Sequence, residues 1–220
     1  MNINMLPVNK EIINRLLVSC VYSFFFIVSS LSNNNINITI FLIFILITSL
    51  LEFFNITKKL KNFILKLLIS TIFIVAPILI IYIIKTELNN GKNLLTFLFL
   101  IVSVNDVFAY LIGSKIGKIK AFKISPNKTI EGFLGGIIAC VIIGPLLINF
   151  LNINLEINSF LLSLLISIFG ICGDLLESYL KRKFNKKDSG TLLMSHGGVL
   201  DRVDSILFCA PILYIIIKLN

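Results

Sequence analysis

Residues 170–205 read GICGDLLESYLKRKFNKKDSGTLLMSHGGVLDRVDS and separate two long apolar runs of the chain. No other stretch of similar length carries as many ionisable groups. Two acidic pairs within it, Asp174 with Glu177 and Asp201 with Asp204, have the same spacing, which places each pair on one face of a helix. The first pair ends one apolar run and the second begins the next. Both pairs are therefore predicted to lie where membrane-spanning helices meet water.

The composition of the whole chain indicates a membrane protein. Hydrophobic residues make up 57% of the 220 residues, and the mean hydropathy of +0.98 is far too high for a soluble domain of this length. We therefore predict an all-α, polytopic integral membrane protein. Apolar stretches near the length needed to cross a bilayer number about seven, at residues 12–31, 38–56, 63–84, 94–113, 130–151, 158–180 and 200–217.

Lysine and arginine are concentrated in every second connection between these predicted spans. The basic connections are 58–66, 115–128 and 181–187, whereas the intervening ones carry few or balanced charges. Because cytoplasmic loops are rich in Lys and Arg, this alternation places the N-terminus and the basic loops in the cytoplasm. It also explains the net charge of +9 without nucleic acid as a partner. The prediction is a multi-pass protein of the cell inner (plasma) membrane.

The chain divides by polarity into two regions of one integrated membrane domain. Residues 1–93 consist mostly of apolar and hydroxyl-bearing spans and are predicted to form a scaffold. Residues 94–220 are predicted to form the catalytic region, with cytoplasmic loops at 114–129 and 181–199. Glu52 is the exception within the scaffold, and we expect its carboxylate to reach the membrane interface.

Two residues upstream of the charged stretch are also candidates for a site. Asp106 interrupts an apolar span, where a carboxylate costs about 3 kcal/mol on insertion scales, so it is expected to face protein or water and to have a partner. An interhelical hydrogen bond or a pair with a lysine would also explain it. Lys128 precedes Thr129, a predicted N-cap for a helix from Ile130, where an anion would be stabilised. A role in topology, or contact with anionic lipid, is the alternative for Lys128.

These features predict an active site on the cytoplasmic side of the membrane. Carboxylate oxygens are the ligands that Mg²⁺ prefers, lysine and arginine bind phosphate, and glycines let the backbone approach a ligand. Two basic loops beside acidic clusters are what a magnesium-bound polyphosphate would require. The pattern therefore indicates phosphoryl chemistry.

The charged stretch also resembles the hallmark of a known family, the phosphatidate cytidylyltransferases or CDP-diacylglycerol synthases. The matching pieces are Ser178-Tyr-Leu-Lys181-Arg182, Lys187-Asp188-Ser189-Gly190, His196-Gly197-Gly198 and Asp201-Arg202-Val-Asp204. Upstream, Asp106 with Ala109-Tyr110 and Gly113, and Ile124-Ser125-Pro126 with Lys128-Thr129, agree with the same family. The resemblance covers about residues 100–210. Met194-Ser195 stands where the family usually has Pro-Gly, a departure from the family pattern at that turn.

The resemblance implies condensation of CTP with phosphatidic acid to give CDP-diacylglycerol and pyrophosphate, with Mg²⁺ as cofactor. It implies Asp174 and Asp201 as metal ligands, with Asp106, Glu177 and Asp204 as further ligands or their neighbours. Asp174, Asp201 and Lys128 are the predicted catalytic residues. The predicted substrate-binding residues, basic or close to the glycines, are Ser125, Lys128, Lys181, Arg182, Lys187, Asp188, His196, Gly197, Gly198 and Arg202.

Simpler explanations exist for several of these residues. Asp174 and Asp201 could form salt bridges at helix ends with Lys181 or Arg202, and Glu177 could pair with Lys181 at i+4. The reaction does not demand a general base, because a phosphate monoester is already largely ionised at neutral pH. The single histidine of the chain therefore fits a role in stabilising a turn or contacting phosphate equally well.

Two other functions are weighed against the cytidylyltransferase reaction. A CTP-dependent kinase of a polyprenol or phytol-type lipid would transfer the γ-phosphate of CTP and leave CDP. An ion-coupled membrane transporter would use Asp106 and Asp174 as coupling carboxylates, but transporters place such groups near the bilayer midplane. Acyl-chain preference, the number of metal ions and the oligomeric state, including a homodimer, are left open by the sequence.

Overall fold

A computed structural model of the protein describes residues 8–122, 124–186, 188–190 and 198–219. Helices dominate the described residues and run in chain order as α1 Val8–Leu31, α2 Asn35–Ile56, α3 Phe63–Ser70, α4 Ala76–Glu87, α5 Gly91–Ile116, α6 Ile130–Phe150, α7 Ser159–Lys183 and α8 Leu200–Leu219. A 3-10 turn, Thr57–Lys59, follows α2, and a π-helical turn, Thr71–Val75, joins α3 to α4. Each of the seven predicted apolar ranges coincides with a helix or with the joined pair α3 and α4.

Within the described residues, five helical segments are long and apolar enough to cross a membrane, namely Asn35–Lys59, Phe63–Glu87, Gly91–Ile116, Ile130–Phe150 and Ser159–Lys183. Helix α1 contributes a shorter apolar part, Cys20–Leu31. The chain is thus a mostly helical membrane protein. Seven crossings, which would require α1 and α8 to span the bilayer as well, stay a prediction.

Short polar segments end one helix and begin the next. The side chain of Asn34 accepts a hydrogen bond from the backbone of Ile36 at the start of α2, and Asn158 does the same for Phe160 at the start of α7. Thr129 accepts from the backbone N–H of Gly132 at 3.1 Å, which confirms the predicted N-cap of α6. Such caps satisfy backbone N–H groups that have no partner inside the helix.

A proline explains the π-helical turn between α3 and α4. Pro77 lies in the first turn of α4 and has no N–H, so the carbonyl four residues earlier lacks its α-helical donor. The preceding π-helical turn, Thr71–Val75, accommodates this mismatch. Pro77 thus disturbs the helix in the third apolar range.

Glycines let α6 pack closely on α5. A Cβ added at Gly136 would lie 2.4 Å from the side-chain oxygen of Asn105, and one at Gly132 would lie 2.7 Å from the carbonyl oxygen of Ala109. These distances are too short for any larger residue. Small residues at helix contacts are a common device in membrane proteins.

A β-hairpin connects α5 to α6, where the sequence analysis expected only a loop in an all-α fold. Strand β1, Lys120–Phe122, pairs antiparallel with β2, Ser125–Thr129. The base of the hairpin is fixed because Glu131, at the start of α6, accepts hydrogen bonds from the backbone N–H groups of Lys118 and Ile119. The prediction of a purely helical fold is therefore wrong in this detail, since a three-residue strand gives almost no periodic signal.

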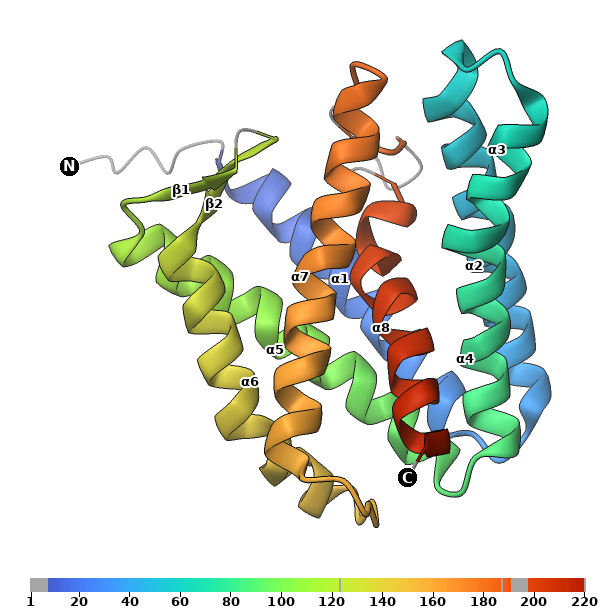
Figure 1. The fold of residues 1–220 in the computed structure, drawn as a ribbon, viewed down its shortest axis with the longest axis vertical. Helices are drawn as coiled ribbons and strands as arrows, with labels where there is room; N and C mark the ends of the chain where they lie inside the picture. Colours follow the sequence, from blue (N-terminus) through green and yellow to red (C-terminus); the bar gives the residue numbers. More distant parts are fainter. Residues whose placement is uncertain (1–7, 123, 187, 191–197, 220) are drawn as a thin grey trace.

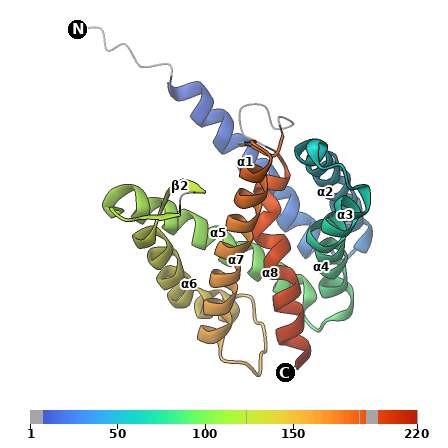
Figure 2. The same cartoon turned by 45° about the horizontal axis from the view of Figure 1, so that its top comes forward.

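Helices α7 and α8 lie at the centre of the bundle, and the other helices surround them in three groups. In Figure 1, α2, α3 and α4 lie on one side, α5 and α6 lie on the other, and α7 and α8 lie between them, with α1 behind. Figure 2 shows the hairpin beyond the end of α6, on the side away from α2. Helices α7 and α8 pack against each other, and α6 packs against α5 and α7. The end of α7, the start of α8 and the hairpin therefore face the same end of the molecule.

Candidate active site

Three elements bring charged side chains together at this end of the molecule. The last turns of α7 carry Asp174, Glu177 and Lys181, whose spacing places them along one face of the helix. The first turns of α8 carry Asp201 and Asp204. Because α7 and α8 are antiparallel neighbours, the two acidic pairs predicted from the sequence meet at one site.

Lys181 joins the two helices. Its ammonium nitrogen lies 2.5 Å from a carboxylate oxygen of Glu177 and 2.5 Å from one of Asp201. The residue is buried, so the pairing occurs in surroundings that screen charge poorly. The i+4 pair of Glu177 with Lys181, weighed as an alternative in the sequence, is confirmed, and so is a salt bridge between Asp201 and Lys181.

Asp201 organises the loop that leads into α8. Its second carboxylate oxygen accepts hydrogen bonds from the backbone N–H of Ser189 at 3.0 Å and of Gly198 at 2.9 Å. One carboxylate thus binds both described ends of the connection between α7 and α8, as well as Lys181. Backbone N–H groups around a carboxylate stabilise its charged form.

Lys128 reaches the same cluster from the hairpin. Its ammonium group forms an ion pair with Asp174. Burial lowers the pKa of Lys128 below its usual range, and the positive charge of Lys181 acts in the same direction. The negative charges of Asp204, Asp106 and Glu177 oppose this effect, in that order of size after burial. Lys128 therefore lies within electrostatic range of acids from α5, α7 and α8.

Glu52 is a component of the cluster that the sequence analysis assigned to the scaffold. Only 3% of the residue is exposed, so its carboxylate faces protein and not water. Its carboxylate accepts hydrogen bonds from the backbone N–H groups of Val199 and Leu200, at 3.0 and 2.9 Å, and from the hydroxyl of Ser189 at 3.1 Å. It caps the N-terminus of α8 from helix α2, which the charge of a carboxylate favours.

A sequence signal for this role existed. Glu52 is the only charged residue in the predicted span 38–56, and a charge in such a span needs a partner inside the protein. The partners are backbone groups more than 130 positions later in the chain, which carry no side-chain signature. The location of its partners was therefore not predictable from the spacing of charged residues.

Two glycines of the charged stretch make room for this carboxylate. A Cβ on Gly190 would lie 2.7 Å from an oxygen of Glu52, and a Cβ on Gly198 would lie 2.2 Å from the other oxygen and 2.0 Å from the hydroxyl of Ser189. The glycines thus allow the loop backbone to close around Glu52. This is a packing reason for the Gly198 that the sequence analysis assigned to substrate binding.

Replacing Gly198 with alanine is expected to cost about 2 kcal/mol or more, because the new methyl group must displace Glu52 or Ser189 from their hydrogen bonds. The matched control is Gly170→Ala in α7, where the nearest atom to an added Cβ is 3.5 Å away. That variant should keep the wild-type thermal midpoint in detergent, or raise it slightly. Equal midpoints for both variants would contradict the proposed packing.

The other predicted substrate-binding residues differ in their surroundings. Ser125 lies in β2 and Arg202 in the first turn of α8. Arg182 is exposed and donates to the carbonyl oxygens of Ile124 and Lys186, so it holds the hairpin near the end of α7. Asp188 is exposed. Three further predicted residues lie outside the described residues, namely Lys187, His196 and Gly197.

The donor atoms in the cluster suit Mg²⁺, which prefers carboxylate oxygens. One oxygen of Glu177 is buried and has no hydrogen-bond partner among the described residues, so it could serve as a ligand. In the described part of the chain, no three His, Cys, Asp or Glu side chains lie together as a ready-made metal cage. Mg²⁺ commonly binds through one or two carboxylates together with substrate phosphates, so the arrangement fits that mode. The predicted metal ligands stay a prediction.

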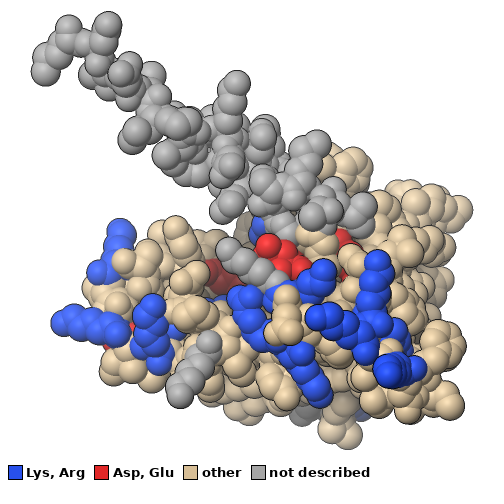
Figure 3. All heavy atoms as spheres, turned by 90° about the horizontal axis from the view of Figure 1, so that it is seen from above, with Lys and Arg blue, Asp and Glu red and all other residues tan. Residues whose placement is uncertain are grey.

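The face of the molecule around the cluster is basic at its rim and acidic at its centre. Figure 3 shows Lys and Arg side chains spread over this face, with Asp and Glu visible between them. Such a distribution would attract a polyphosphate while reserving the acidic centre for a metal ion or a lysine. The charge distribution of the site thus suits a nucleoside triphosphate bound together with a metal ion.

Comparison with known proteins identifies the family of the chain. A model of the Cytidylyltransferase family matches residues 2–220. The chain belongs to this family. The resemblance found in the charged stretch is therefore confirmed. Of its motif residues, the structure brings together Lys181, Ser189, Gly198 and Asp201 between the ends of α7 and α8.

Several curated relatives of this cytidylyltransferase-family chain are named phosphatidate cytidylyltransferase. The protein from Staphylococcus haemolyticus is 46% identical over 131 residues, which cover 59% of this chain and 50% of the relative. The protein from Staphylococcus aureus strain COL is 44% identical over the same length. That from Staphylococcus saprophyticus is 42% identical over 138 residues, 62% of this chain and 53% of the relative. The chain thus spans about half the length of the curated relatives it matches.

Proposed function

We propose that the protein transfers a cytidylyl group from CTP to phosphatidic acid, forming CDP-diacylglycerol and pyrophosphate. The observation that supports this most is the meeting of Lys128, Asp174, Lys181 and Asp201 at one end of a helical membrane protein. This placement suits a reaction between a water-soluble nucleotide and a lipid. Family membership and the names of the relatives agree with the same reaction.

In the proposed reaction, a phosphate monoester oxygen of phosphatidic acid attacks the α-phosphorus of CTP. The bond from that phosphorus to the oxygen bridging the α- and β-phosphates breaks, and pyrophosphate leaves with the electron pair. No protein nucleophile is needed, so the enzyme acts by positioning and by stabilising negative charge. Lys128 and Lys181 are placed to neutralise phosphate oxygens, each held in place by an acidic partner.

Asp174 and Asp201 would hold Mg²⁺, with Asp106, Glu177 and Asp204 as further ligands or as neighbours that orient them. When bound, the metal ion would supply positive charge beside the phosphates of CTP. A carboxylate has about four acceptor positions. Hydrogen bonds among the described residues use three of those of Asp201, which leaves one for such a role.

The proposed placement in the cell follows from charge. The basic face would lie in the cytoplasm, with the N-terminus on the same side and seven helices crossing the inner (plasma) membrane. CTP would then reach the site from the cytoplasm and phosphatidic acid from the surrounding bilayer. A homodimer would be compatible with this placement.

The reaction can be tested on purified, detergent-solubilised protein with Mg²⁺, phosphatidic acid and CTP labelled at either the α- or the γ-phosphorus. Label from the α-position should enter the lipid, and label from the γ-position should appear in pyrophosphate. A lipid kinase would instead place the γ-label in the lipid. That result, or no labelled lipid from either substrate, would refute the proposed reaction.

Replacing Lys128 with methionine should lower kcat/KM for CTP by about a hundredfold, because a buried cation that contacts phosphates contributes roughly 2–3 kcal/mol. Lys118→Met is the matched control, since Lys118 lies in the same basic connection with an exposed side chain. The control should stay within about twofold of the wild type. Equal losses in the two variants would indicate a general electrostatic effect of the basic face.

A further inference from the structure

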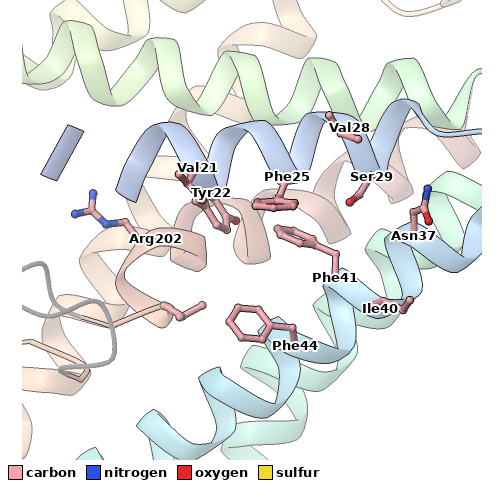
Figure 4. Close-up of a pocket in the computed structure, with 11 residues that line it drawn as sticks. Val21, Tyr22, Phe25, Val28, Ser29, Asn37, Ile40, Phe41, Phe44 and Arg202 are labelled. Atoms are coloured by element: carbon pink, nitrogen blue, oxygen red, sulfur yellow. The ribbon is translucent and has the colours of Figure 1, made fainter. Parts of the chain in front are cut away.

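A long apolar groove lies between α1 and α2, on the outside of the helical bundle and beside the active site. Its volume is about 810 Å³, which lies within the usual range for sites that bind small molecules and cofactors. Figure 4 shows side chains of α1 on one wall and of α2 on the other. The groove is lined largely by aliphatic and aromatic side chains, among them Val21, Phe25, Val28, Ile40, Phe41 and Phe44.

One end of the groove reaches the active site. Val199 and Arg202, from the start of α8, form this end. The backbone N–H of Val199 donates a hydrogen bond to Glu52, and Arg202 follows directly after Asp201. The opposite end lies near Ser29 and Asn37, close to the turn between α1 and α2. The groove therefore runs from the charged cluster along α1 and α2 toward the turn that joins them.

At the end of the groove near the active site, Tyr22 supplies a polar group that lacks a hydrogen-bond partner among the described residues. Its hydroxyl oxygen is buried and has no hydrogen-bond partner among the described residues. The ring packs against Phe26, Phe41 and Phe99, so the hydroxyl is held in place. It also lies within electrostatic range of Asp204. Buried hydroxyls are normally satisfied, so an unpartnered one beside a groove indicates a ligand atom there.

We propose that this groove binds an acyl chain of the phosphatidic acid substrate, with the glycerol end of the lipid at Tyr22 and its phosphate near Arg202. This proposal rests on the proposed function. The combination of an apolar channel with a cation and a hydroxyl at one end matches an anionic glycerolipid. A purely apolar partner would leave Tyr22 and Arg202 without a role in binding.

The outward exposure of the groove suits this ligand. Val21, Phe25 and Val28 on α1, and Ile40 and Phe44 on α2, are all exposed on the surface of the molecule. A lipid in the surrounding bilayer could therefore enter sideways without leaving an apolar environment. Because the acyl chain of the lipid would move from one apolar environment to another, its length would contribute little to affinity. Tight binding would come from the shape of the groove and from the polar groups at its end.

A bulky residue toward the far end of the groove should make the enzyme sensitive to chain length. Val28 lies six residues after Tyr22, about 9 Å further along α1. In Val28→Trp, a short acyl chain would stop before the indole, whereas a long chain would collide with it. The ratio of kcat/KM for dioleoyl- over dihexanoyl-phosphatidic acid should fall at least about tenfold, the effect of a modest steric clash.

Ile138→Trp is the matched control, because Ile138 is also an exposed aliphatic residue of a membrane helix but lies on α6. In Ile138→Trp, the ratio of kcat/KM for dioleoyl- over dihexanoyl-phosphatidic acid should stay within about twofold of the wild-type ratio. An unchanged ratio in Val28→Trp, or an equal fall in both variants, would overturn the proposal.

Direct labelling separates this proposal from the proposed function. Phosphatidic acid with a photoreactive diazirine at the end of one acyl chain should label residues 21–44 in the wild type, and much less in Val28→Trp. Labels mainly on other helices would overturn the groove even if CDP-diacylglycerol is formed. Labels in the groove of a protein that forms no CDP-lipid would uphold the groove and refute the reaction.

Discussion

Replacing Asp201 with asparagine is expected to lower kcat for CDP-lipid formation by at least about a hundredfold, a loss of about 2.7 kcal/mol. One oxygen of Asp201 binds Lys181, and the other binds two backbone N–H groups. An asparagine side chain has only one oxygen, so either orientation turns an NH₂ group toward a donor. The ammonium of Lys181 or the loop before α8 must then move, and with it the predicted metal site.

The control for this variant is Glu156→Gln, an exposed acid in the connection between α6 and α7 at the opposite end of the molecule. It should retain wild-type kcat. Turnover of Asp201→Asn within about threefold of the wild type, measured with saturating CTP, phosphatidic acid and Mg²⁺, would remove Asp201 from the catalytic site.

Replacing Glu52 with leucine should destabilise the protein by about 3 kcal/mol and lower activity at least tenfold. The substitution leaves the buried N–H groups of Val199 and Leu200 without an acceptor, and each such group costs about 1–3 kcal/mol. It also removes a negative charge from the N-terminus of α8. The thermal midpoint in detergent should fall by several degrees, at about 2–4 °C per kcal/mol.

Two further variants distinguish this explanation from a general effect of the mutation. Glu52→Gln keeps one acceptor oxygen and should be intermediate in both stability and activity. Glu87→Leu changes an exposed glutamate at the end of α4 and should leave the midpoint unchanged. A Glu52→Leu protein as stable as Glu87→Leu would show that the hydrogen bonds at α8 contribute nothing to stability.

The positions of the helices were largely predictable because long apolar runs have a strong signal. The cap at Thr129 and the meeting of Lys181 with Asp201 followed from local rules as well, since a charged turn between two antiparallel helices must bring its ends together. The sequence also identified Lys128, whose place between a turn and a cap set it apart from the neighbouring lysines.

What the sequence did not predict depends on contacts between distant parts of the chain. The β-hairpin is too short for a periodic signal, and Pro126 within β2 argued for a turn. The contact of Glu52 with α8 was not predicted, because its partners there are backbone N–H groups, which every residue except proline has. The groove between α1 and α2 arises from how two apolar helices diverge, and no single residue in either helix marks it.

The contact of Glu52 with α8 also constrains the order in which the protein matures. Helix α2 precedes α8 in the chain, yet the backbone N–H groups that satisfy its buried carboxylate lie at the start of α8. Until α8 has been synthesised, Glu52 lacks these donors, and Asp201 is absent from the end of α7. The charged cluster is thus completed only when α8 packs against α2 and α7.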